Sequence, residues 1–390
     1  MKLALYAHPW DLRALAAQAG LERLRALGYS EIALAVSYHA GRWLTPWDPT
    51  GMVRFLEDGV VHFRPRGDYG VLEPLASSEV VDGEPSPLEW LCEHAPGAGI
   101  DPRAWMVGTH NTRLGELHPD QCVENAFGDL YFYSLCPRRS EVRQYLQAMI
   151  ADVAAHRGLS RIEIEGFSWM GWKHSCHHEK SSVIPSARLQ ELLGLCFCSA
   201  CLADPLGDGV RDKVADYLRA ALTEGDAMEP VDADAAPRQV DLEPIVEQAL
   251  VTARAQRVAV DCETVAAVAS ESAVPLALQV HQDPHFRGSQ MAFDEQLVGA
   301  VAEGTEWVMT TYGTGPDAIE AMLAATPAAL LEQPDKRLCI WPKAPQFTCD
   351  ADLQRVVALC RDHGFATIAV YHLGMLPWRT IERVAAAMSG

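Results

Sequence analysis

Basic residues are scarce in this chain. Its 390 residues include 32 Lys and Arg against 52 Asp and Glu, which gives a net charge of -20. Proteins that bind nucleic acid or anionic membranes need a basic surface, because both partners carry dense negative charge. The composition therefore argues against nucleic acid and membrane partners, and a neutral or cationic small molecule suits the chain better.

Long apolar runs are also missing. None approaches the ~18 residues of a membrane span, and the N-terminal stretch MKLALYAHPWDL turns polar after six residues, which is short for a secretory signal. We therefore expect a cytoplasmic protein. Thiols are kept reduced in that compartment, so the 11 cysteines should bind metal or pack in the core rather than form a disulfide framework.

Neither a GxGxxG motif nor a P-loop is present, which speaks against an open doubly wound sheet. Instead, short apolar runs alternate with amphipathic helical stretches, the pattern of βα units around a parallel sheet. The predicted strands are Leu3–Ala7, Ile32–Ser37, Ala104–Thr109, Arg161–Glu165, Pro275–Val280, Trp307–Thr311, Arg337–Trp341 and Thr367–Tyr371. The predicted helices include Asp11–Leu27, Ser140–Arg157, Asp212–Leu222, Leu242–Ser270, Pro316–Ala325, Asp350–His363 and Pro377–Met388. Eight such units predict an α/β fold of the (β/α)8 TIM barrel class.

Two segments are too long for ordinary loops. Residues 43–100 are rich in Pro, Gly and acidic residues and are predicted to form an inserted lid or hairpin over the barrel mouth. Residues 223–241 are predicted to be a solvated linker. Because barrels often exceed the usual domain length, we expect residues 1–390 to form a single barrel domain. The oligomeric state is left open, with a homo-oligomer as one alternative.

Polar and aromatic side chains follow the predicted strands, where a TIM barrel builds its active site. Aromatic rings that stack on sugar faces, together with donors and acceptors for hydroxyl groups, suit a carbohydrate-like substrate. The candidate substrate-binding residues are His8, Tyr38, His39, His110, Asn111, Trp169, His178, His281, Tyr312, Trp341, Tyr371 and His372. Any one of them could equally be a hydrogen-bonded surface residue, and the histidines could instead hold a second metal.

The stretch RIEIEGF supplies the leading catalytic candidate. Side chains alternate along a strand, so Glu163 and Glu165 should face the barrel interior while the isoleucines pack outward. Glu165 lies nearer the mouth, and nearby aromatic residues would raise its pKa by desolvation, as a general acid requires. A structural glutamate paired with Arg161 is the alternative. Asp283 and Glu179 are candidates for a second catalytic carboxylate.

A cysteine triplet follows in LCFCSAC. Cys196, Cys198 and Cys201 can wrap a tetrahedral zinc ion if one more ligand arrives, and Cys176 is the first choice, with Cys136 and His178 as alternatives. A zinc loop after the fourth strand is therefore predicted. All-thiolate zinc sites are closed and structural, but core thiols or a catalytic metal remain alternatives. The absence of HExxH excludes a zincin.

These residues resemble those of the glycoside hydrolase superfamily over residues 100–205. The triplet, with one further upstream cysteine, is most similar to the cluster of family 42 β-galactosidases. The segment SLCPRRSEVRQYLQAMIADVAAHRGLSRIEIEGF also resembles glycoside-hydrolase-like barrel proteins of unassigned activity. The resemblance implies a barrel enzyme with a catalytic acid at the end of strand four, a place that Glu165 occupies.

Two departures from that pattern bear on the mechanism. Ile164 precedes Glu165 where such hydrolases usually have Asn, and RLCIWPKAP offers no carboxylate nucleophile at strand seven. We therefore expect an atypical or inverting glycoside hydrolase that pairs Glu165 with Asp283 or Glu179. The alternatives are a sugar-directed lyase, isomerase or epimerase that uses Glu165 with the strand-end histidines, and a non-catalytic barrel that binds a carbohydrate or a partner protein.

Overall fold

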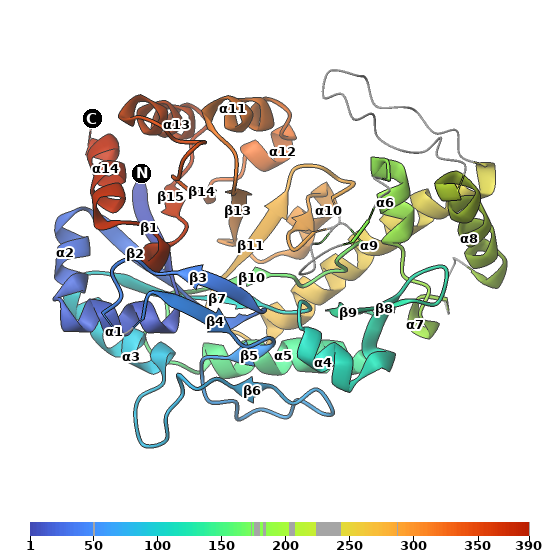
Figure 1. The fold of residues 1–390 in the computed structure, drawn as a ribbon, viewed down its shortest axis with the longest axis horizontal. Coiled ribbons are helices and arrows are strands. Elements are labelled where there is room, and N and C mark those ends of the chain that lie inside the picture. The colour runs from blue at the N-terminus through green and yellow to red at the C-terminus, as the bar shows by residue number, and fades with distance from the viewer. Residues whose placement is uncertain are drawn as a thin grey trace.

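A closed barrel of eight parallel strands forms the centre of the molecule (Figure 1). The computed structural model describes residues 1–49, 51–172, 174, 180–181, 185–202, 207–223, 243–286 and 288–389. The barrel strands are β1 (Lys2–Ala7), β2 (Tyr29–Tyr38), β7 (Asp101–Val107), β10 (Arg161–Glu165), β11 (Leu276–His281), β13 (Glu306–Thr311), β14 (Lys336–Ile340) and β15 (Thr367–Val370). Each follows its predecessor around the ring, and β1 pairs with both β2 and β15, which closes the sheet. The predicted (β/α)8 barrel is confirmed, and all eight predicted strands are present.

Alternation along the strands divides the core into two layers. Side chains that point outward, such as Ile162 and Ile164, join the large apolar cluster between sheet and helices. Side chains that point inward form a separate cluster in which alanines such as Ala33 and Ala277 leave room for Tyr6 and Trp105. The barrel is therefore filled by side chains, and only the strand ends are available to a ligand.

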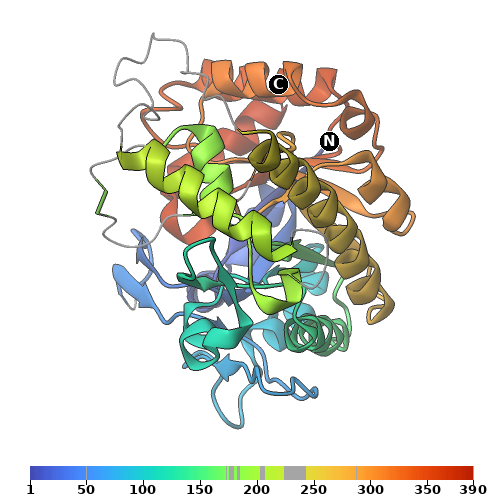
Figure 2. The same ribbon diagram turned by 90° about the vertical axis from the view of Figure 1, so that its right-hand side faces the viewer.

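Helices surround the barrel (Figure 2). They are α1 (Pro9–Ala17), α2 (Gly20–Ala26), α3 (Pro87–His94), α5 (Ser140–Ala154), α9 (Pro244–Ser270), α10 (Glu295–Ala300), α11 (Pro316–Ala324), α12 (Ala328–Leu331), α13 (Asp350–Asp362) and α14 (Trp378–Ser389). The predicted single helix Asp11–Leu27 is wrong, because Ala19 adopts a left-handed conformation with φ 49° and separates α1 from α2. Within the described residues, no helix combines the length and the apolar character needed to cross a membrane.

The predicted insertion at residues 43–100 contains more than a lid. A hairpin of β3 (Gly41–Leu44) and β4 (Val53–Leu56) is followed by β5 (Val60–Val61), β6 (Leu75–Ala76), the barrel helix α3 and a short helix at Pro96–Ala98. The hairpin forms its own two-stranded sheet. Its Trp43 packs against His8 at the end of β1, so the hairpin covers part of the mouth.

Two further insertions extend the molecule on the side of α6 and α8 (Figure 1). Between β7 and α5 lie α4 (Thr112–Leu117), the short helix Pro119–Gln121, β8 (Cys122–Glu124) and β9 (Leu130–Leu135), a hairpin that the sequence did not predict. After β10 come α6 (Ala187–Leu193), α7 (Ser199–Cys201) and α8 (Gly207–Thr223). The short strand β12 (Met291–Ala292) and the turn Leu373–Met375 complete the structure. The predicted linker 223–241 lies outside the described residues apart from Thr223, which ends α8.

An ionic layer fills the barrel at the end opposite the mouth. Arg103 and Arg337 lie between the carboxylates of Glu31 and Glu306, and all four side chains are buried. Arg103 Nη1 is 3.0 Å from a Glu31 oxygen, and Arg337 Nε is 3.2 Å from a Glu306 oxygen. Although burial opposes ionisation, the two guanidinium groups lower the pKa of Glu31 to about 2 and also lower the pKa of Glu306. This layer joins β2, β7, β13 and β14 and leaves the other end of the barrel for chemistry.

Candidate functional site

Glu165 stands at the mouth, at the end of β10, and is half-buried. Trp105 Nε1 donates a hydrogen bond to its Oε2 at 2.8 Å, and the Ser289 hydroxyl donates a second. Burial raises the pKa of the Glu165 carboxyl; these two hydrogen bonds oppose the rise, and the neighbouring Glu163 adds to it. The group is thus reachable from the mouth and holds its proton to a higher pH than a free glutamate.

Glu163 lies one layer deeper on the same face of β10 and is fully buried. Its Oε1 accepts hydrogen bonds from Tyr6 Oη at 2.6 Å and from Gln279 Nε2 at 2.7 Å. Arg103 Nη2 stands 4.0 Å from its Oε2. Both glutamates face inward as the alternation predicted, but only Glu165 can meet a substrate.

Three tyrosine hydroxyl groups lie near Glu165. Burial raises the pKa of Tyr38, Tyr312 and Tyr371, and the negative charge of Glu165 raises each of them further. The Tyr38 and Tyr371 hydroxyl oxygens are 3.3 Å apart, and the rings of Tyr312 and Tyr371 are 4.4 Å apart. Trp341 packs on Tyr371 at 5.3 Å. Because burial raises the pKa of each phenol, they remain protonated and can donate to sugar oxygens. The structure thus brings four of the predicted substrate-binding residues together with Glu165.

His8 and His372 lie at the ends of β1 and β15, and both are fully buried. Their ring centroids are 4.6 Å apart. His8 stacks on Trp10 at 4.7 Å, and its edge meets Tyr38 at 4.9 Å. Burial holds the pKa of His8 well below its ordinary value and lowers the pKa of His372 to about 3, so both imidazoles are neutral.

Three further histidines form a row at adjacent strand ends. His39 follows β2 and stacks on His110, which follows β7, at 4.3 Å. A ring nitrogen of His174, in the segment after β10, is 3.2 Å from His110 Nδ1. His39 Nδ1 is 2.8 Å from the Ala40 carbonyl oxygen, so it carries the proton and leaves Nε2 as an acceptor. Burial first, and the neighbouring histidines second, lower the pKa of His110.

Other predicted substrate-binding residues are engaged elsewhere. Asn111 caps α4, its Oδ1 accepting from the Leu114 amide at 2.9 Å. Trp169 donates from Nε1 to the Cys136 sulfur at 3.3 Å, so it belongs to the cysteine cluster. His281 stacks on Phe286 at 4.0 Å.

The candidates for a second carboxylate are less well defined than Glu165. Asp283 is exposed on the loop after β11, where its Oδ1 accepts from the His285 amide at 2.8 Å. The same loop carries Ser289, which contacts Glu165. Glu179 lies outside the described residues, as do Cys176 and His178.

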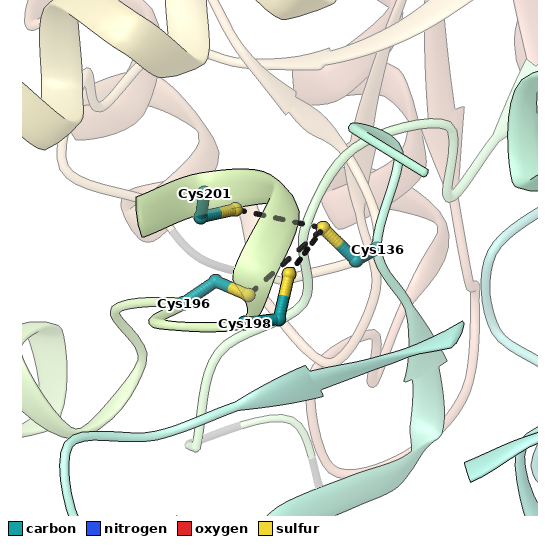
Figure 3. A group of neighbouring side chains, drawn as sticks. All are labelled: Cys136, Cys196, Cys198 and Cys201. Atoms are coloured by element: carbon teal, nitrogen blue, oxygen red, sulfur yellow. Dashed lines mark hydrogen bonds between the residues drawn. The ribbon is translucent and has the colours of Figure 1, made fainter. Parts of the chain in front are cut away.

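Four cysteine sulfurs converge beside the barrel (Figure 3). Cys136 follows β9, Cys196 and Cys198 lie just before α7, and Cys201 is its last residue. The Cys136 sulfur is 3.6 Å from that of Cys201, 3.7 Å from that of Cys198 and 3.9 Å from that of Cys196. These separations are too long for disulfides. Cys136, one of the alternatives for the fourth ligand, therefore completes the set without Cys176.

The spacing of the sulfurs fits a four-coordinate metal. Metal–sulfur bonds of about 2.3 Å in a tetrahedron place sulfurs about 3.8 Å apart, close to the observed separations. All four cysteines are buried, and they share an apolar cluster with Trp169, Tyr131 and Val260. The Trp169 indole donates a hydrogen bond to the Cys136 sulfur, as neighbouring groups commonly do to the ligands of a metal. The residues can hold a metal ion in a closed site with no position left for a substrate.

Several site residues were not among the predicted catalytic, substrate-binding or metal-binding residues. Trp105 and Tyr6 point into the barrel, two and one positions before their strands end, and Ser289 reaches Glu165 from a loop. Trp105 could have been predicted from its position on the strand, because every second side chain of a barrel strand points to the interior. Lys343, whose Nζ lies 3.1 Å from the centre of the Trp341 ring, had no such signal.

Comparison with known proteins supports the fold. No protein-family model and no curated protein matches the sequence. Among solved structures, the chain is similar to the catalytic domain of a β-amylase from Paenibacillus polymyxa, with 10% identity over 99% of this chain and 98% of that one and a TM-score of 0.55. It is also similar to the PgaB (BpsB) glycoside hydrolase domain from Bordetella bronchiseptica, with 12% identity, 100% and 97% coverage and a TM-score of 0.57.

A third similar structure is a β-galactosidase from the psychrophilic Marinomonas ef1. The identity is 12% and the TM-score 0.55, over 100% of this chain and 59% of that one. These neighbours are glycoside hydrolases, so the resemblance of the fold to that of glycoside hydrolase barrels is confirmed.

Proposed function

We propose that the protein is a glycoside hydrolase-like enzyme that acts on a carbohydrate or glycoside, with Glu165 as its general acid/base. The observation that carries the proposal is the setting of Glu165. Its half-buried carboxyl has a raised pKa and accepts from Trp105, and it lies near three protonated tyrosines at the barrel mouth. A carboxylic acid with a raised pKa keeps its proton to a higher pH and can donate it to a leaving glycosidic oxygen.

The second catalytic role falls to a residue away from strand seven. After β14 the chain continues through Trp341 and Lys343, and neither side chain is a carboxylate. A nucleophile there is therefore missing from the described residues, which favours an inverting or otherwise atypical mechanism. Asp283, on the same loop as Ser289, or Glu179 would then activate water or stabilise positive charge.

A lyase, isomerase or epimerase acting on a sugar is the second candidate. The observation that favours it is the row of His39, His110 and His174, in which His39 has an acceptor nitrogen directed away from Ala40. A neutral imidazole at the same barrel mouth as Glu165 would form an acid/base pair with it for proton transfer at carbon. A barrel that only binds carbohydrate is the remaining alternative.

We further propose that the four-cysteine site holds zinc with a structural role. Zinc suits four thiolates in a tetrahedron, and a closed set of four protein ligands leaves no coordination position for a reacting water. The ion would tie the segment after β9, through Cys136, to the insertion that contains α7. It would thereby hold in place the loop that follows the catalytic strand.

Turnover of a panel of aryl glycosides tests the function. Wild type is compared with Glu165→Gln, which keeps an acceptor for Trp105, and with Glu263→Gln, an exposed glutamate on α9. We expect Glu165→Gln to lose ~10²–10⁴-fold in turnover, the usual contribution of a general acid/base, and Glu263→Gln to lose nothing. Equal turnover by both variants would remove Glu165 from the chemistry. Turnover by none of the proteins would favour the isomerase-type or binding function.

A further inference from the structure

Six buried polar atoms at the ends of β1 and β15 have no hydrogen-bond partner among the described residues. They are both ring nitrogens of His8, both ring nitrogens of His372, and the indole nitrogens of Trp10 and Trp43. The four side chains are 0%, 0%, 3% and 5% exposed, respectively. Folded proteins pair nearly all of their buried polar groups, and an unpaired cluster therefore calls for a specific explanation.

The four residues come from separate parts of the chain and meet around His8. His8 lies flat against Trp10, with ring planes 1° apart, and presents its edge to Trp43 at 5.1 Å. His372 leans on it from β15 at 4.6 Å. Because parallel stacking directs ring nitrogens along the plane of each ring, His8 and Trp10 cannot hydrogen-bond to each other. Their polar edges are left without a hydrogen-bond partner in the part of the chain that the structure describes, and a bound ligand could supply one.

The cluster carries no net charge. Both histidines are neutral, since burial lowers the pKa of each, and burial raises the pKa of Asp11 to about 8, so this neighbour of His372 is protonated at neutral pH. Arg54 lies over the Trp10 ring but donates from Nε to Asp48 at 2.9 Å. Two imidazole N–H and two indole N–H groups donate, and two imidazole nitrogens accept. That mixture beside aromatic faces matches the hydroxyl groups of an uncharged sugar rather than a phosphate or a carboxylate.

Trp43 closes the cluster from the β3–β4 hairpin. It faces inward, whereas its neighbours Leu44, Val53 and Phe55 on the hairpin are exposed by 52% or more. The hairpin strands pair only with each other and not with the barrel sheet. The hairpin can therefore move without breaking hydrogen bonds of the barrel sheet, although the bond from Trp47 Nε1 in its loop to the Leu373 carbonyl oxygen, 3.1 Å long, would have to open. Because the four side chains are at most 5% exposed, only the end of a sugar chain could reach them once the hairpin has moved.

We propose that His8, Trp10, Trp43 and His372 form a subsite for one terminal, uncharged sugar unit, and that the β3–β4 hairpin lifts Trp43 to admit it. This inference rests on the proposed carbohydrate function and adds to it the charge of the sugar and the end-on mode of binding. The subsite adjoins Glu165 through Tyr38, whose ring meets His8 at 4.9 Å and whose hydroxyl group has Glu165 as an electrostatic neighbour.

The test is a binding titration followed by tryptophan fluorescence, which Trp10 and Trp43 should report. The neutral probes are D-glucose, D-galactose, D-mannose and N-acetyl-D-glucosamine, and the charged probes are D-glucuronic and D-galacturonic acid. At least one neutral sugar should bind wild type, and its uronic acid should bind at least tenfold more weakly. The variants are His8→Phe, His372→Phe and Trp43→Phe, which keep an aromatic ring and remove the unpaired nitrogens.

Each variant should bind the neutral sugar at least tenfold more weakly while its melting temperature without sugar stays equal or rises. His94→Phe is the matched control, because His94 stacks on Trp90 at 4.6 Å on the exposed face of α3. It should leave binding unchanged. A lower melting temperature in all three variants with unchanged binding would mean that the nitrogens serve the fold, and would overturn the inference. Failure of every neutral sugar to bind, or equal binding of a sugar and its uronic acid, would overturn it as well.

The outcomes separate this inference from the proposed function, because binding needs no turnover. Sugar binding that depends on His8 in a protein without hydrolytic activity would keep the subsite and reject the hydrolase. Glycoside turnover that depends on Glu165, together with sugar binding that is insensitive to His8→Phe, would do the opposite.

Discussion

Glu165 combines two properties that usually exclude each other, access to solvent and a raised pKa. Its strand brings it to the mouth, while burial and the neighbouring Glu163 raise the pKa of the carboxyl against the hydrogen bond from Trp105, which lowers it. Ser289 acts in the same direction as Trp105, because its hydroxyl group donates to the ionised form and lowers the pKa. The balance between burial and this hydrogen bond sets the pH at which the acid loses its proton.

Ser289→Ala should therefore move the alkaline limb of the pH–activity profile to higher pH. A general acid works only while protonated, so activity falls as pH rises through its pKa, and removal of a donor to the carboxylate raises that pKa. A hydrogen bond to a charged group contributes ~1.5 kcal/mol, which corresponds to a shift of roughly one pH unit. The measurement is kcat/KM against pH. Ser272→Ala is the control, because Ser272 precedes the N-terminal end of β11, whereas the mouth lies at the C-terminal ends of the strands. A limb that moves to lower pH would contradict the assignment.

The protonation of Asp11 should make the stability of the protein depend on pH. Burial raises its pKa from 3.8 to about 8, so the folded protein keeps a proton that the unfolded chain releases. The stability that this proton contributes is fully present below pH 3.8 and is lost as pH rises toward 8. Asp11→Asn removes the titration but keeps an acceptor for the His8 amide, which Asp11 Oδ2 binds at 2.8 Å.

The gain in melting temperature of Asp11→Asn over wild type should therefore increase between pH 4 and pH 8, the interval over which wild type loses stability. Thermal denaturation in buffers across that range measures it. A gain that is the same at every pH would show that Asp11 is ionised in the folded protein throughout.

At the scale of elements, the cysteine site joins segments that the barrel does not hold together. Cys136 follows β9, and the triplet lies on or before α7, about 60 residues further along the chain. The β8–β9 hairpin and the insertion after β10 pack on each other through the apolar cluster that surrounds the sulfurs, and hydrogen bonds such as that from Tyr131 Oη to the Leu193 carbonyl oxygen at 2.6 Å also join them. A metal at this point would stabilise both insertions at once.

Cys136→Ser should abolish metal binding and lower the free energy of unfolding by more than about 2 kcal/mol, the range of the larger single-site losses. Metal content by mass spectrometry should fall from one ion per chain to none, and zinc should be the ion released. Cys349→Ser changes an exposed cysteine that precedes α13 and does not belong to the four-cysteine site. It should alter neither the metal content nor the free energy of unfolding. Purified wild type that contains no metal would reject the zinc proposal, and a second ion per chain would point to the histidines.

Some helices and strands could be predicted from the sequence and others could not. The barrel strands were predictable because most are apolar runs between helices. In β10, the alternation of Ile and Glu correctly directed Glu163 and Glu165 to the interior. The break at Ala19 was missed because the apolar pattern continues from α1 into α2. Tyr312 and Tyr371 were predictable as well, because each directly follows a barrel strand whose end could be located in the sequence.

Residues in the long loops were harder to predict. Trp169 and Asn111 lie close in sequence to strand ends, but their partners, Cys136 and the α4 backbone, come from contacts that no local pattern specifies. The choice between Cys136 and Cys176 as fourth ligand had the same difficulty. The position of a ligand distant in sequence depends on the path of a loop, and loop paths are set by tertiary packing. Residues 1–390 as a single domain, and the cytoplasm as location, stay predictions.

For the whole molecule, the ionic layer at the closed end is the clearest departure from an apolar barrel. Arg337 is fully buried between Glu31 and Glu306, and Arg103 completes the layer. Arg337→Met should therefore destabilise the protein by ~3–5 kcal/mol, because two buried carboxylates lose a partner. Chemical denaturation measures the change, and Arg355→Met, which removes a surface ion pair of α13, should cost less than about 1 kcal/mol. A similar loss in both variants would contradict a special role for the layer.

Acid should also lower the free energy of unfolding by protonating Glu31 in this ionic layer. The pKa of Glu31 is lowered to about 2, so its contribution to stability is present above its ordinary pKa near 4.5 and is lost as pH falls toward 2. Arg337→Met should weaken that dependence.

The pairing of β1 with both β2 and β15 has a consequence for how the chain is made. During synthesis β1 can join β2 at once, but its other edge stays open until some 360 further residues have left the ribosome. An exposed strand edge invites pairing with other chains. The nascent protein therefore carries its most vulnerable edge from the first strand to the last, and a chaperone that shields β1 during elongation would favour yield more than one that acts on the released chain.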